Sequence, residues 1–185
     1  LQGDGRYNVF YTGNNKTTGQ ELSALGSGVG IGNEGLNNVT VNLTAGQTLT
    51  LDQNRAPDGN LTVTSGTFDL STYTFNRSSG GGTLTVSDGG TLKIGGTNSF
   101  PSSYNTNSLS SASTVNYSGT TQSVANLTYG NLVLSGSGSK TISNSLSIVG
   151  TLSIYASAIA NLANGTTSSA AELKIDGATI ILPKN

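Results

Sequence analysis

Short stretches of alternating aliphatic and polar residues recur along the whole chain, and glycines separate them. Most have the form Leu-Thr-Val or Leu-Ser-Ile, which places aliphatic side chains on one face of a strand and polar side chains on the other. β-Branched residues dominate these stretches, and signals for helices are nearly absent. The one window of helix-like composition runs from 157 to 171, and Asn164-Gly165 interrupts it. We therefore expect strands at 39–43, 48–51, 61–63, 67–70, 84–86, 92–94, 132–134, 146–148, 152–154 and 173–175.

Several of these stretches are copies of one unit. Residues 60–70, 83–94 and 145–154 each consist of a short strand, a glycine-centred corner and a second short strand. Leu61 and Leu84 occupy equivalent positions in the first two copies, and the step between them matches the length of one solenoid coil. Such short strands suit the flat faces of a parallel β-helix, in which strands of successive coils stack about 4.8 Å apart.

The predicted fold class is therefore all-β, a parallel β-helix or β-solenoid. A β-sandwich is the alternative, because Asp-Gly pairs such as Asp58-Gly59 favour tight hairpins. We divide the chain into an irregular N-terminal or capping segment, 1–38, and β-solenoid repeats over 39–185. Aliphatic residues of the repeats, Leu84 among them, should form one continuous core, and their neighbours, such as Thr85, should point outward.

The amino-acid composition excludes several kinds of catalytic and metal-binding site. Of 185 residues, 26 are Gly, 26 Ser, 26 Thr and 20 Asn, whereas His, Cys, Met and Trp are absent. Without imidazole or thiol there is no Ser–His or Cys–His nucleophile pair, no thiolate or imidazole metal site and no disulfide. A net charge of −1 gives no electrostatic footprint for nucleic acid, and no apolar run is long enough for membrane insertion. The chain opens at Leu1 without the pattern of a signal peptide, so we expect a processed piece of a larger protein.

Three loops have spacings known from binding motifs. Residues 30–35 match the dinucleotide-binding glycine pattern, but a strand start follows where a helix is needed. Residues 136–141 are similar to a phosphate loop, with Ser139 in place of the second glycine. Asp52 and Asp58 lie with two amides in a loop that could supply oxygen ligands to Ca²⁺, although an Asx-capped turn explains them better. We assign no catalytic, cofactor-binding or metal-binding residue and expect no cofactor.

The acidic residues lie mostly at corners or strand ends, where turn chemistry explains them. Asp69 is the exception, because it occupies an outward strand position from which it could approach Asp88 or Arg77 of a neighbouring coil. The aromatic residues are expected in the core or at corners rather than as platforms for sugars. Asn-x-Ser/Thr tripeptides are expected by chance in such a composition, and they begin at Asn15, Asn38, Asn42, Asn60, Asn76, Asn116, Asn126 and Asn164.

Residues 82–101, 113–124 and 129–142 carry a resemblance to a known group. The last of these, with the pattern Tyr-x-Asn-Leu-x-Leu-Ser-Gly-x-Gly-x-Lys-Thr, is the most specific. They resemble the β-strand-repeat, adhesin-like surface proteins of Bacteroidetes and related bacteria, over roughly residues 12–154. This resemblance implies a right-handed β-helical stalk, an extracellular or cell-surface location and no catalytic residues to transfer.

The leading functional hypothesis is a structural and adhesive β-helical segment of a large secreted or cell-surface bacterial protein, assembling into a stalk or fibre. Its partners would be neighbouring repeats or copies of itself head-to-tail, together with surface glycans. A second hypothesis is an ice- or polysaccharide-binding module, motivated by the outward pairs Thr48/Thr50, Thr62/Thr64 and Thr83/Thr85, whose unequal spacing predicts that they do not form one flat lattice. A third is a β-helical polysaccharide-cleaving enzyme, which would need two converging carboxylates. We expect no enzyme.

Overall fold

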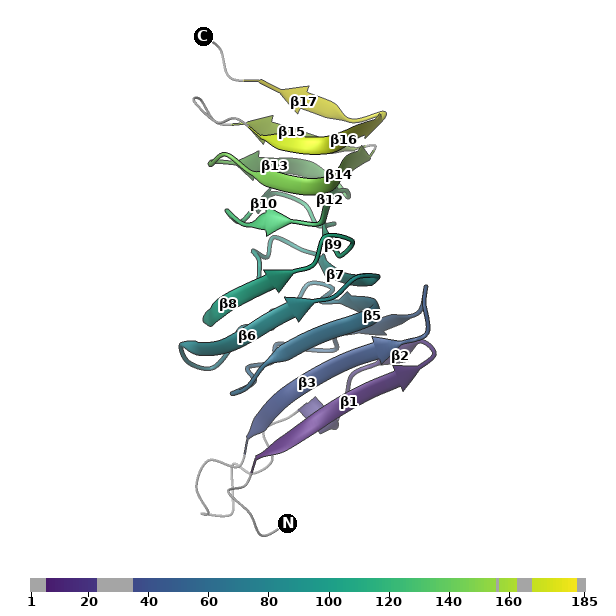
Figure 1. The fold of residues 1–185 in the computed structure, drawn as a ribbon, viewed down its shortest axis with the longest axis vertical. Coiled ribbons are helices and arrows are strands. Elements are labelled where there is room, and N and C mark those ends of the chain that lie inside the picture. The colour runs from purple at the N-terminus through teal and green to yellow at the C-terminus, as the bar shows by residue number, and fades with distance from the viewer. Residues whose placement is uncertain (1–5, 23–34, 156, 163–167, 183–185) are drawn as a thin grey trace.

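Parallel strands that pair with the coil before and the coil after them make up nearly the whole structure. The computed structural model describes residues 6–22, 35–155, 157–162 and 168–182. Within these ranges the only helical turn is the 3-10 turn η1 (Gln20–Leu22). The chain climbs from one end to the other as a β-solenoid of about 6 turns, with the N- and C-termini at opposite ends (Figure 1). The predicted parallel β-helix is confirmed, and the β-sandwich is excluded.

Each coil has up to three faces, which we call the first, second and third face. The first face contains β1 (Tyr7–Gly13), β3 (Leu36–Leu43), the start of β5 (Leu61–Asp69), β6 (Gly81–Val86) and β8 (Tyr104–Leu109). The second face contains β2 (Lys16–Thr17), β4 (Thr48–Thr50), the end of β5, β7 (Gly90–Ile94), β9 (Thr114–Tyr117), β12 (Asn131–Leu134), β14 (Ser147–Tyr155) and β16 (Ser169–Asp176), and β11 (Thr128–Tyr129) pairs with the start of β14. The third face contains β10 (Gln122–Ser123), β13 (Gly138–Ile142), β15 (Ala158–Leu162) and β17 (Thr179–Ile181).

The register stacks aliphatic residues into continuous columns inside the coil. Leu61 pairs with Leu84 on the first face, and both are fully buried. The outward neighbours Thr62 and Thr85 pair with each other and remain partly exposed, as the alternation predicts. One column on the second face, which we call the main column, consists of Leu49, Phe68, Leu92, Val115, Leu132, Leu152 and Leu173.

The corner inside β5 shows why glycine is needed between two short strands. Gly66 has a φ of +77° and belongs to both faces, so β5 turns the corner without ending. A Cβ at this position would lie 2.8 Å from the Cβ of Leu43 and 2.9 Å from the carbonyl oxygen of Gln47. The predicted glycine-centred corner is therefore a place where the chain has both the backbone conformation and the closeness that only glycine permits.

Two sequence-based expectations need correction. The segment 1–38 is not wholly irregular, because β1 and β2 lie in it and pair with β3 and β4; the solenoid begins near Tyr7 rather than at residue 39. The window of helix-like composition, 157–171, contains β15 and the start of β16 instead. Two of its alanines, Ala158 and Ala160 on β15, are buried inside the coil, whereas Ala170 and Ala171 on β16 are exposed. Residues 1–5, 23–34 and 163–167 lie outside the described ranges.

The coil changes its cross-section after β8. Among the described strands, β8 pairs with β6 alone, and its other edge has no strand beside it. Asn107 holds the column position next to Leu84, yet it is exposed. In the following coil the interior is filled by Tyr117 and Tyr129, whose hydroxyls lie 3.2 Å apart, and the third face becomes a regular sheet. Figure 1 shows the resulting step between β8 and β10.

Candidate functional site

The densest group of charges links the first two coils, and we call it the N-terminal polar cluster: Tyr11, Thr18, Glu21, Asp52 and Arg55. The Tyr11 hydroxyl donates to Oε1 of Glu21 at 2.6 Å, and the Thr18 hydroxyl donates to Oδ1 of Asp52 at 2.5 Å. Arg55 Nη2 donates to both oxygens of Asp52 at 2.8 and 3.0 Å, and to the carbonyl oxygen of Gly19 at 2.7 Å. The cluster therefore joins the first coil, which contains β1 and β2, to the coil above it.

The electrostatics of the cluster favour fixed ionised groups over a proton shuttle. Burial raises the pKa of Tyr11, and the neighbouring Glu21 raises it further. Burial also raises the pKa of Glu21 and of Asp52, but hydrogen bonds outweigh it, so both values end below their ordinary range. For Glu21 the donors are Tyr11 and the backbone N–H of Gly19; for Asp52 they are Thr18 and Arg55. Each carboxylate is thus held charged by its own donors.

The suspected calcium loop does not bring its two carboxylates to one site. Asp52 contacts Thr18 in the coil below, whereas Asp58 accepts a hydrogen bond from Ser78 in the coil above. Within the described ranges, no three His, Cys, Asp or Glu residues converge as a metal site would require. Asp52 and Asp58 therefore each connect the loop to a different neighbouring coil, rather than capping the turn as the sequence predicted.

Asp69 has a different partner from the two considered on sequence grounds. It pairs in register with Lys93 on the next coil, and its carboxylate lies 2.8 Å from Lys93 Nζ. Arg77 instead donates to the carbonyl oxygens of Gly59 and Asp58, and Asp88 accepts the backbone N–H of Ala112 at 2.9 Å. The expected approach of Asp69 to Asp88 or Arg77 is wrong, because the register was not known.

Asparagine side chains at corners and strand ends form a repeated contact between coils. The Oδ1 of Asn38 accepts the backbone N–H of Asn60 at 2.7 Å, and the Oδ1 of Asn60 accepts that of Thr83 at 2.8 Å. The same arrangement joins Asn8 to Asn38, Asn15 to Thr48, Asn54 to Thr74, Asn76 to Ser102 and Asn131 to Thr151. Asn15, Asn38, Asn60 and Asn76 begin tripeptides that we expected by chance; in the structure these four side chains connect one coil to the next.

Lys140, in the run that is similar to a phosphate loop, lies inside the protein. Its side chain is fully buried on β13, and Nζ donates to the carbonyl oxygens of Gly119, Thr120 and Ser137 at 2.9, 2.6 and 2.8 Å. Burial lowers the pKa of Lys140, while the three carbonyls favour the ammonium form. Only residues 136 and 137 of the run form a corner; residues 138–141 belong to β13, and Lys140 binds the coil below from within the strand. Of the dinucleotide-type pattern at 30–35, residues 30–34 lie outside the described ranges, and β3 begins directly after Gly35.

Outward threonines stack into ladders on two faces. On the second face Thr48, Thr67, Thr91 and Thr114 pair in succession, and on the first face Thr40, Thr62 and Thr85 do so. The three Thr-x-Thr pairs do not form one lattice, because Thr48 and Thr62 lie on different faces; threonines from other strands complete each ladder. A shallow depression of about 340 Å³ lies over the start of the second-face ladder, lined by Asn15, Lys16, Thr17, Thr48 and Thr50.

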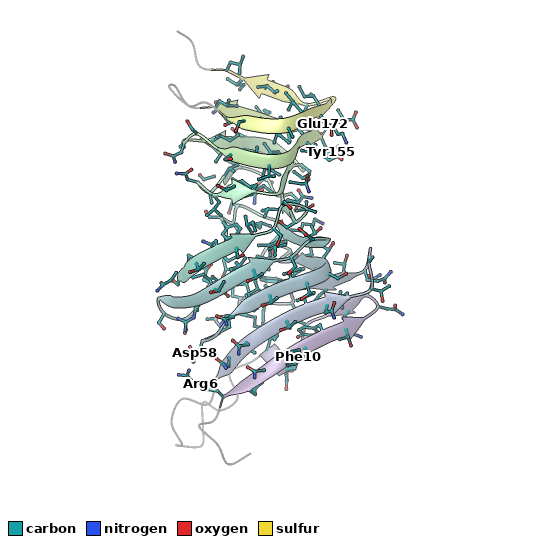
Figure 2. The ribbon with its side chains drawn as sticks, in the orientation of Figure 1. Arg6, Phe10, Asp58, Tyr155 and Glu172 are labelled. Atoms are coloured by element: carbon teal, nitrogen blue, oxygen red, sulfur yellow. The ribbon has the colours of Figure 1, made fainter. Side chains whose placement is uncertain are left out.

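Most aromatic side chains are in the core, as expected. Phe68, Phe75, Tyr117 and Tyr129 are fully buried. Phe10 is the main exception: it is 69% exposed on β1 and stands next to Thr40 at the foot of the first-face ladder (Figure 2). Tyr155, at the end of β14, is 45% exposed.

No helix in the described part of the chain is both long and apolar enough to cross a membrane. Comparison with protein-family models, with curated proteins and with solved structures finds no match. Function must therefore be argued from the geometry above.

Proposed function

We propose that this chain is a structural segment, a β-helical spacer, of a large secreted or cell-surface bacterial protein, where it holds adhesive modules away from the cell. The observation that carries the proposal is the use of polar side chains. Asn, Asp, Arg and Lys residues that could serve a site are instead bonded to the next coil, as at Asn60, Lys140 and Asp69.

A spacer needs a uniform core and strong contacts between successive coils, and the chain supplies both. Its buried columns run through successive coils, and its backbone pairing is between neighbouring coils rather than within one coil. Such repeat architectures can be lengthened without changing the interface, because each coil contacts only its neighbours. Neighbouring repeats are the partners that this role requires, and it requires neither cofactor nor catalytic residue.

The experiment is immunogold electron microscopy of the bacterium that produces the chain, with antibodies raised against the folded 185-residue segment. We expect label outside the outer surface and its loss when intact cells are treated with protease. Label confined to the cell interior would refute the proposal. So would the release of new reducing ends or unsaturated uronates from polysaccharides incubated with the purified segment, since a spacer has no such activity.

A second candidate function, binding of an extended polysaccharide, is favoured by the threonine ladders and Phe10. The second-face ladder supplies a row of hydroxyls at the spacing of stacked strands, about 4.8 Å. The adjacent outward column contains the ion pair of Asp69 and Lys93, which interrupts a uniform hydroxyl surface. This interruption argues for a sugar chain rather than ice. Pull-down with insoluble polysaccharides tests each ladder separately: Phe10→Ser should weaken binding along the first face, and Thr91→Val should weaken binding along the second face. Ice recrystallisation should be unchanged by the protein.

A further inference from the structure

We propose that the C-terminal end of the solenoid is a docking surface for a further parallel β-coil that carries aliphatic residues at alternate positions. We define this C-terminal end face by Leu173, Ile175, Ile181 and Leu182, which are 54, 50, 46 and 66% exposed. Leu173 and Ile175 lie on β16 and pair in register with Leu152 and Ile154 of β14, so they continue columns that belong to the core in the coils directly below. Leu173 and Ile175 are therefore exposed members of core columns and not scattered surface positions.

Two other edge strands, β8 and β2, differ from β16 at their column positions, which makes the contrast informative. On β8 the column position next to Leu84 is taken by the polar Asn107. On β2 the column position next to Leu49 is taken by Lys16. Both residues are exposed, and charged or polar side chains on an edge strand are one way in which proteins prevent it from pairing with another strand. On β16 the two column positions remain aliphatic.

The polar side chains of β16 point to the same conclusion. Glu172, Lys174 and Asp176 alternate with the two aliphatic residues and pair with Thr151, Ser153 and Tyr155, so the strand keeps the inward–outward pattern of the coils below it. The alternation of residues along β16 and the exposure of its two aliphatic side chains together fit a strand that pairs with a further strand whose aliphatic residues lie in the same register.

The occupant that fits is a β-coil like those below, continuing the interface already seen between β14 and β16. Such a coil would bury Leu173 and Ile175 and would pair with the free backbone groups of β16, which is strand addition at a sheet edge. The N-terminal coil of a second copy fits worse. In a head-to-tail stack it would bring Lys16 to the column above Leu173, and burying an unpaired ammonium there is unfavourable.

This inference deepens the proposed structural role, and it rests on that role for its biological meaning. Its test is independent of location. A second copy of residues 145–162 is joined directly after Asn185 of the full chain. Residues 182–185 and 145–146 then separate β17 from the copied β14 by the same number of residues that separates β15 from β16. The copied Leu152 should lie over Leu173.

Hydrogen–deuterium exchange at the β16 amides is the measurement, with far-UV circular dichroism to verify that the parent fold is intact. We expect the extension to slow exchange in β16 at least tenfold. The matched control is the same extension with Leu152→Asn and Ile154→Asn in the copy only, which reproduces the pattern of β8 and should give no protection.

Three outcomes would overturn the inference. The aliphatic copy could give no protection of β16, or both copies could give equal protection. The third is that the unextended chain self-associates in sedimentation and its β16 amides become protected as it does so. The last would make a second copy the occupant. The proposed function fails separately, since label confined to the cell interior would leave these exchange results unchanged.

Discussion

Truncation of two leucines in the main column should have very different costs. Leu92 is fully buried on β7, with Phe68 below it and Val115 above it. Leu173 occupies the last position of the same column, with Leu152 below it and a 54% exposed side chain. Leu92→Ala and Leu173→Ala therefore remove the same atoms from equivalent strand positions, and they differ only in whether another coil covers them.

The magnitudes follow from burial. Removing a fully buried leucine loses its transfer free energy and leaves a cavity, at a total cost of about 2–5 kcal/mol. At Leu173 about half of the side chain is already in water, and the space left by truncation opens to solvent. The cost should therefore be below about 1 kcal/mol, roughly half of the transfer term for a buried aliphatic side chain.

The assay is urea-induced unfolding followed by far-UV circular dichroism, with Thr91→Ser as an outward control on the same strand as Leu92. Thr91→Ser should change the free energy of unfolding by less than about 0.5 kcal/mol. Equal costs for Leu92→Ala and Leu173→Ala would refute the reasoning, because Leu173 would then have to be covered in solution. A silent Leu92→Ala together with a destabilising Thr91→Ser would show that the register of β7 is wrong.

Three further perturbations test interior contacts. Tyr129→Phe removes the hydroxyl that donates to the carbonyl oxygen of Ala125 at 2.7 Å, so thermal denaturation should show a loss of about 1–3 kcal/mol; an unchanged melting temperature would contradict this contact. Lys140→Met leaves three carbonyl oxygens without their donor and should cost at least about 3 kcal/mol in urea unfolding, with Lys140→Ala no less damaging. The pKa values of Glu21 and Asp52 are lowered in the folded protein, so their contribution is present above their ordinary values of 4.5 and 3.8 and is lost as the pH falls through the folded values. Amide exchange in the first coil, relative to its intrinsic rate, should therefore accelerate as the pH falls below these ordinary values, and Glu21→Gln should reduce this dependence.

The core was predictable because it depends on local alternation. A period of two fixes which side chains share a face, so Leu84 and Thr85 could be assigned to inside and outside from the sequence alone. The same pattern does not determine which coil lies next to which. The coils differ in length, and the extra residues lie in the corners. The pairing of Asp69 with Lys93 therefore could be assigned only once the register between β5 and β7 was known.

The hydrogen bonds of asparagine side chains between coils were not predicted from the sequence, because they too depend on which coil lies next to which. Asn38 and Asn60 each precede an alternating stretch by one residue, and this shared offset was a usable signal. In a chain with 20 asparagines the offset was lost among chance tripeptides. Lys140 was harder to place, since a lysine beside glycine and serine is ordinarily a solvated corner residue. Its burial depends on three carbonyl oxygens that approach one another only when the third face forms.

Pairing between successive coils also determines how the protein would respond to force. The two termini lie at opposite ends of the solenoid (Figure 1), so tension applied through them acts first on the outermost coil. That coil is held only by its one neighbour, and it can peel away while the rest stays folded. With a step of 23 residues between equivalent positions such as Asn60 and Thr83, each event would lengthen the tether by roughly 70–80 Å of extended chain. The protein would extend as a series of small, separate yields, which limits the peak load on whatever it connects.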